Sequence, residues 1–140
     1  MGEAAGVQVI VQHSDGRVLL QLRDDEPEIP YPNTWCIPGG MRDAGEGARE
    51  CAARELREEL GLTVAPEALE LVGAETRSYG HETTFALHRD VDPAEIDLTE
   101  GQAIALFSRS EVAAMPLGYD DNAVLESYFR RPQPRGTRGR

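Results

Sequence analysis

The chain has 140 residues, which suffice for one domain of ordinary size and are too few for two. Its 40% apolar residues include no run near the roughly 18 that a membrane span needs, so we predict no membrane segment. The net charge of -11 comes from 25 acidic and 14 basic residues. All 14 are arginine, which excludes a lysine nucleophile, a Schiff base and a P-loop lysine.

The charge is distributed unevenly along the chain. The last eleven residues, Arg130 to Arg140, contain five of the 14 bases and no acid, which leaves nine bases against 25 acids in Met1 to Phe129. Such an acidic body repels nucleic acid and phosphates, so we predict no specific nucleic-acid partner. A phosphate substrate would need a bridging cation, for which a divalent metal is the natural candidate.

Two features indicate the compartment. Met1 to Gly6 lacks the basic-then-apolar pattern of a signal peptide, so a cytoplasmic location is predicted. Cys36 and Cys51 form no CxxC pair and have no histidine at zinc-finger spacing. We interpret both as reduced thiols.

The first third of the chain predicts strands and a loop. Two β-rich runs around a turn indicate a hairpin: Val7 to Val11, Ser14 to Gly16, and Val18 to Leu22. Asp24 to Asn33 contains three prolines and several acids and predicts a loop. Trp35 to Ile37 is a short apolar segment that ends in Pro38-Gly39-Gly40.

The rest of the chain predicts two helices, further strands and a tail. Gly47 to Leu60 favours a helix with Gly61 as its C-cap, and Asp120 to Phe129 favours a closing helix. The predicted strands are Leu69 to Tyr79, Thr83 to His88, and Ile104 to Phe107. Strands mixed with two helices predict an α/β domain, over residues 1–130, whose sheet is covered on both faces. Residues 131–140 are predicted to be a disordered tail.

The first helix carries three acids on one side. At about 100° per residue, Glu59 lies about 40° and Glu58 about -60° from Glu55, within an arc of roughly 100°. Leu56 and Leu60 fall together on another side and form a stripe that faces a core. Like charges at this spacing repel, so arginine pairs or a bound hard cation would have to offset them.

The residues around these acids resemble the Nudix box. Nine positions over 23 residues match it: Gly40, Glu46, Arg54, Glu55, Leu56, Glu58, Glu59, Gly61 and Leu62. The chain is similar to Nudix hydrolases over roughly Val7 to Arg130. The resemblance implies an α/β/α sandwich with a mixed β-sheet, in which the box is a loop–helix–loop.

The resemblance also implies a metal site and catalytic residues. Glu55, Glu58 and Glu59 would bind Mg²⁺, with Mn²⁺ as a substitute, and the Gly40 carbonyl would be an extra ligand. Arg54 would orient carboxylates, chiefly Glu46 and Glu55, by ion pairing.

The general base has several candidates. Within the box, Glu55 or Glu58 could take the proton of the attacking water. Glu100, on a loop just before the Ile104 strand, matches a downstream glutamate that serves as the base in several members. Asp97 is a weaker competitor.

The resemblance implies hydrolysis of a diphosphate linkage in a small nucleotide-type substrate. The Trp-Cys-Ile-Pro-Gly-Gly lead-in resembles members that cleave nucleoside triphosphates, including 8-oxo-dGTP diphosphatases. Tyr79, seventeen residues past Leu62, resembles the tyrosine of dinucleoside polyphosphate hydrolases. The proline typical of many ADP-ribose hydrolases is replaced, since Arg77 and Ser78 stand there.

Substrate contacts are predicted by residue type and position. Arginine would supply further phosphate contacts, from Arg23, Arg42, Arg77 or Arg89. Trp35, Tyr79 or Phe85 could stack on a base, although a core position is favoured for Trp35.

Two alternatives to a simple nucleotide hydrolase remain open. A dinucleoside polyphosphate or ADP-sugar hydrolase is one, and a non-catalytic module that senses a nucleotide is another. Because sensing modules usually lose a box carboxylate and this chain keeps them all, the enzyme is favoured. A homodimer, common in the family, could use the apolar Val7 to Leu22 region.

Overall fold

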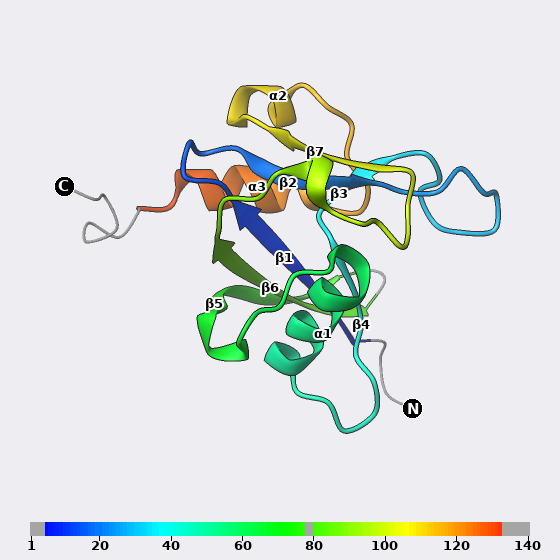
Figure 1. Cartoon of the computed structure of the whole chain (residues 1–140), viewed down its shortest axis with the longest axis vertical. Helices are drawn as coiled ribbons and strands as arrows, with labels where there is room; N and C mark the ends of the chain where they lie inside the picture. The colour runs from blue at the N-terminus through cyan, green and yellow to red at the C-terminus, as the bar shows by residue number, and fades with distance from the viewer. Residues whose placement is uncertain (1–4, 78–79, 133–140) are drawn as a thin grey trace.

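The computed structural model describes residues 5–77 and 80–132. In this part of the chain seven strands form one sheet, accompanied by three α-helices and two 3₁₀ helices (Figure 1). The strands are β1 (Ala5–Gln12), β2 (Val18–Leu22), β3 (Trp35–Cys36), β4 (Gly39–Met41), β5 (Glu70–Arg77), β6 (Gly80–His88) and β7 (Ala103–Phe107). The helices are α1 (Ala48–Leu60), η1 (Pro66–Ala68), η2 (Pro93–Glu95), α2 (Arg109–Ala113) and α3 (Asp121–Arg130).

The sheet is mixed, as predicted. Its order is β3-β2-β1-β6-β5, with β4 added to β1 and β7 added to β2. The central strands β1 and β6 run parallel, while the other pairs are antiparallel. The predicted hairpin is confirmed, because β1 and β2 pair at Gln12 and Val18 beside its turn.

Helices cover the sheet on both faces. The side chains of β1 alternate between the two faces and therefore contribute to two separate cores. Val7, Val9 and Val11 pack with α1 in one cluster. Ile10 belongs to the other cluster, which includes Leu125 of α3. Figure 1 shows α1 well apart from α2 and α3, which lie with β2 and β7. None of the helices in the described ranges is both long and apolar enough to cross a membrane.

The predicted box helix forms as α1, with its apolar stripe in the first core. Leu56 and Leu60 are each 1% exposed. The helix ends at Gly61, whose φ of 69° and ψ of 17° lie in the left-handed region that favours glycine. The Gly61 N–H donates to the Arg57 carbonyl at 3.0 Å. The helix therefore fixes where each of its acids points.

The structure also contains elements that the sequence pattern did not predict. The short helix α2 is capped by Ser108 and Glu111, whose side chains bond to each other's backbone N–H. β4 forms on the Gly39-Gly40 segment because it pairs with β1. Arg131, placed in the predicted tail, contacts Glu70 and the Tyr128 ring. Residues 133–140 lie outside the described part of the chain.

Candidate active site

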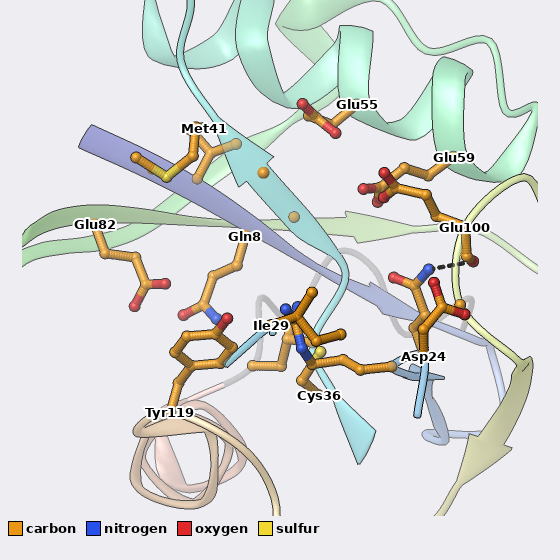
Figure 2. Close-up of a pocket in the computed structure, with 18 of the residues that line it drawn as sticks. Gln8, Asp24, Ile29, Cys36, Met41, Glu55, Glu59, Glu82, Glu100 and Tyr119 are labelled. Atoms are coloured by element: carbon orange, nitrogen blue, oxygen red, sulfur yellow. Dashed lines mark hydrogen bonds between the residues drawn. The ribbon is translucent and has the colours of Figure 1, made fainter. Parts of the chain in front are cut away.

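A pocket of about 440 Å³ lies between β1 and β2, on the side away from the pair that they form at Gln12 and Val18. Residues from five strands, α1 and four connecting segments line it. Figure 2 shows Glu55, Glu59 and Glu100 on one side of the pocket and Gln8, Glu82 and Tyr119 on the other. The two ends therefore differ in chemistry: one gathers carboxylates, and the other combines an amide, a carboxylate and a phenol.

The two glycines of β4 allow α1 to approach the sheet closely. A Cβ on Gly39 would lie 2.1 Å from the Val7 carbonyl oxygen, so the pairing of β4 with β1 requires glycine there. A Cβ on Gly40 would lie 2.3 Å from Cδ of Glu55. The Glu55 carboxylate thus occupies the space that a side chain at position 40 would fill.

Arg54 connects three of the predicted carboxylates. Its guanidinium donates to Glu46 at 2.7 and 2.9 Å, to Glu55 at 3.1 Å and to Glu58 at 3.0 Å. It also donates to the Met41 carbonyl at 3.1 Å, which ties α1 to β4. The hydrogen bonds from Arg54 lower the pKa of Glu46 to about 2. This arginine therefore holds Glu55 in place while it neutralises Glu46.

Glu100 reaches the pocket because its loop binds both α1 and β2. The Thr99 hydroxyl donates to the Glu58 carbonyl at 2.7 Å, and the Gln102 N–H donates to the Leu22 carbonyl at 2.8 Å. Between these anchors, the Gln21 side-chain amide donates to the Glu100 carbonyl at 2.7 Å. The predicted downstream glutamate is thus brought beside the box helix.

Three carboxylates crowd this end of the pocket. Glu59 is 7% exposed, and its burial, together with Glu100 and Glu55, raises its pKa to about 9. Burial also raises the pKa of Glu55, although Arg54 and Glu59 hydrogen bonds oppose that rise. Buried acids hold protons when no cation compensates their charge.

The donor set fits a hard divalent cation. Mg²⁺ takes oxygen ligands, commonly one or two carboxylates completed by water and substrate phosphates. Glu55 and Glu59 supply carboxylates, and the Glu55 carboxylate lies directly over the Gly40 backbone. Within the described ranges, no three His, Cys, Asp or Glu side chains already converge on one point. Glu58 is 55% exposed, bonds to Arg54 and does not line the pocket.

The predicted substrate contacts are divided between the pocket and the core. Arg23 lines the pocket, where it donates to the Pro30 carbonyl at 2.8 Å and lies 5.5 Å from the Tyr119 ring centroid. Trp35 packs edge-on against Phe107, 5.0 Å between centroids, in the second core and outside the pocket lining. Tyr79 lies outside the described residues.

The remaining position-based candidates have other partners. Phe85 is buried in the first core, and Arg89 donates to the Thr63 carbonyl. Arg42 donates to the Glu46 carbonyl. Arg77 pairs with three carboxylates, of Glu75, Glu82 and Asp120. None of these four residues lines the described pocket.

Sequence reasoning missed the residues at the far end of the pocket. Gln8 carries a detectable signal, since it is a polar residue between the apolar Val7 and Val9 of β1 and is 3% exposed. Glu82 lies on β6 opposite Gly6 of β1, a register that the sequence does not state. Tyr119 adopts a φ of 55°, which is rare for a tyrosine and has no sequence signal.

The buried carboxyl of Asp121 holds Gln8 in the pocket wall. Its Oδ2 accepts the Ile37 N–H at 2.8 Å, and its Oδ1 accepts the Gln8 amide N–H at 3.0 Å. The Thr84 hydroxyl donates to the other end of the Gln8 amide at 2.8 Å. Burial raises the pKa of Asp121 to about 7, although the two N–H donors oppose the rise.

We expect Asp121 to make stability depend on pH. Its pKa in the fold, about 7, exceeds the ordinary value of 3.8, so its contribution is complete at low pH and is lost as the pH rises through about 7. Relative to Asp121→Asn, the wild type should lose up to roughly 4 kcal/mol between about pH 4 and 7, at about 1.4 kcal/mol per unit. Urea unfolding across this range measures the difference, and parallel curves would contradict the expectation.

Comparison with known proteins agrees with this architecture. A family model described as NUDIX domain matches residues 2–128. A putative 8-oxo-dGTP diphosphatase of Bacillus subtilis is 41% identical over 63 residues, which cover 45% of this chain and 38% of that protein. An ADP-ribose pyrophosphatase of Methanocaldococcus jannaschii is 26% identical over 132 residues, covering 91% of this chain and 73% of that protein.

Solved structures show the same fold. The E. coli ORF135 protein has a TM-score of 0.70 at 28% identity, covering 92% of this chain and 90% of that one. The chain spans only 24% to 38% of the length of the first curated relatives that it matches. The family match nevertheless extends over nearly the whole chain, from the first strand to the last helix. The chain therefore belongs to the NUDIX domain family.

Proposed function

We propose that the protein is a divalent-metal-dependent hydrolase that cleaves the diphosphate linkage of a nucleoside triphosphate or a related nucleotide. The observation that carries this proposal is the pocket end where Glu55, Glu59 and Glu100 meet beside the Gly40 backbone. Relatives of the chain bear names that include a putative 8-oxo-dGTP diphosphatase and an ADP-ribose pyrophosphatase, which agree with a nucleotide substrate.

An acidic pocket can accept a phosphate chain only if its charge is compensated. Mg²⁺, when bound, would neutralise the diphosphate oxygens and lower the pKa of the attacking water. Glu55 and Glu59, with the Gly40 carbonyl, would hold it. Arg54 keeps Glu55 in position through its hydrogen bond of 3.1 Å.

The proton of the attacking water needs an acceptor within the pocket. Glu100 suits this role, because its loop is anchored on both sides and its side chain lies beside Glu59. Glu58 suits it less well, since it is half-exposed and bonds to Arg54 outside the pocket lining. Attack by water on a phosphorus would release a nucleoside monophosphate, or another phosphate ester, and the remaining phosphate fragment.

A panel of nucleotides tests the proposal directly. The purified protein is incubated with nucleoside triphosphates, 8-oxo-dGTP, ADP-ribose and dinucleoside polyphosphates, with and without Mg²⁺, and the products are separated. We expect Mg²⁺-dependent release of a monophosphate from a triphosphate. Turnover of ADP-ribose alone would favour the activity named for the M. jannaschii relative. Binding without turnover of any compound would favour a nucleotide-sensing module.

A further inference from the structure

The far end of the pocket is lined by polar and aromatic side chains. It is formed by Gln8 of β1, Glu82 of β6 and Tyr119, which precedes α3, and Figure 2 shows the three side chains close together. We propose that this end holds the nucleobase and that Glu82 selects bases that present two adjacent N–H donors, as guanine does. This inference rests on the proposed function, which places the phosphates at the Glu55 end.

The Glu82 carboxylate is held in a fixed position. Arg77 donates through Nε to Glu82 Oε1 at 3.0 Å, and the two side chains are 13% and 12% exposed. Arg77 is itself fixed by further pairs with Glu75 at 3.0 Å and Asp120 at 3.4 Å. A carboxylate has about four lone-pair directions, so Glu82 can bond to Arg77 and still accept hydrogen bonds from a ligand.

The Gln8 amide next to it also has a fixed orientation. The Gln8 NH₂ group donates to Asp121 Oδ1 at 3.0 Å. The Thr84 hydroxyl then donates to the Gln8 carbonyl oxygen at 2.8 Å. Because Gln8 lines the pocket, it offers a ligand a constant pattern of donor and acceptor atoms.

The Tyr119 side chain bounds this end and is braced from outside. Its ring centroid lies 4.6 Å from that of Tyr31, and the Arg23 guanidinium lies 5.5 Å from the same ring. Ile29 adds an apolar surface to the lining. A rigid aromatic and apolar wall with a few fixed polar atoms is typical of a site for a flat, heteroatom-rich ring.

The polar atoms favour one type of base. Guanine presents N1–H and an N2 amino hydrogen side by side, and both can donate to a single carboxylate. Adenine presents an amino donor beside the N1 acceptor, so its N1 lone pair would face a Glu82 oxygen without a hydrogen between them. A bidentate contact of this kind discriminates between bases by at least about tenfold.

Binding of nucleoside monophosphates tests the inference without requiring catalysis. By calorimetry, we expect GMP to bind the wild-type protein at least about tenfold more tightly than AMP, with IMP, which lacks the N2 amine, between them. Glu82→Gln replaces one acceptor with a donor and should reverse the preference toward AMP. Glu75→Gln removes another partner of Arg77, on a side chain 66% exposed and outside the pocket lining, and should leave the preference unchanged.

The outcomes separate this inference from the proposed function. Equal affinities for GMP and AMP, no detectable binding of either, or an equal response to Glu82→Gln and Glu75→Gln would overturn the base assignment. Mg²⁺-dependent hydrolysis of triphosphates in the same preparation would still uphold the proposed chemistry. Conversely, a GMP preference that Glu82→Gln reverses, in a protein without turnover, would retain the base site and reject the hydrolase.

Discussion

Replacing Glu59 with glutamine is expected to lower the Mg²⁺-dependent kcat by about 10²–10³-fold while raising the melting temperature of the metal-free protein. The activity falls because the amide keeps the shape of the side chain but removes one of the two pocket carboxylates of α1. The stability rises because a carboxyl that is 7% exposed, with its pKa raised to about 9, must take up a proton when the chain folds at neutral pH, whereas the amide need not. The gain should be about 1–3 kcal/mol at neutral pH.

Steady-state hydrolysis measures the loss of kcat, and thermal unfolding with and without Mg²⁺ measures the stability and the response to the metal. Wild-type protein should gain melting temperature on addition of the metal, and Glu59→Gln should gain far less. Glu50→Gln is the matched control, because Glu50 lies on the same helix but is exposed and away from the pocket lining. If Glu50→Gln lost as much activity as Glu59→Gln, the effect would belong to the helix as a whole and not to the pocket.

The box helix shows how far a local pattern can predict a site. The spacing of Glu55, Glu58 and Glu59 placed them within one arc of the helix, and the Leu56 and Leu60 stripe is buried as expected. The pattern could not predict that Glu55 and Glu59 line the pocket while Glu58 is half-exposed to solvent. This division depends on what covers the helix, namely β4 and the loop that carries Glu100.

Long-range contacts explain what the sequence could not predict. Glu100 was placed only loosely, because its approach depends on Thr99 bonding to the Glu58 carbonyl, 41 residues away. Trp35 suited both a stacking and a core role, and its contact with Phe107 is set by the pairing of β2 with both β3 and β7. The far end of the pocket likewise depends on the parallel register between β1 and β6.

Replacing Gly40 with alanine should damage the site more than the fold. The added Cβ would lie 2.3 Å from Cδ of Glu55, so the carboxylate must move by an ångström or more. A displacement of that size in a positioned catalytic group costs about 10²-fold, and we expect kcat/KM to fall accordingly. Overpacking should also lower the free energy of unfolding, by about 1–3 kcal/mol. Steady-state hydrolysis and urea unfolding measure the two effects.

Substitutions at two other glycines test whether the activity loss of Gly40→Ala comes from the displaced Glu55 carboxylate. Gly73→Ala in β5 meets nothing within 4 Å, so it should change stability by less than about 1 kcal/mol and leave hydrolysis unchanged. Gly39→Ala would strike the Val7 backbone at 2.1 Å and should break the pairing of β4 with β1, which lowers stability and activity together. Gly40→Ala should instead lose activity while most of its stability remains. The reason is that the Glu55 side chain can move away from the added Cβ, whereas the β1 backbone next to Gly39 cannot. Full activity in Gly40→Ala would mean that Glu55 need not lie over this backbone for catalysis.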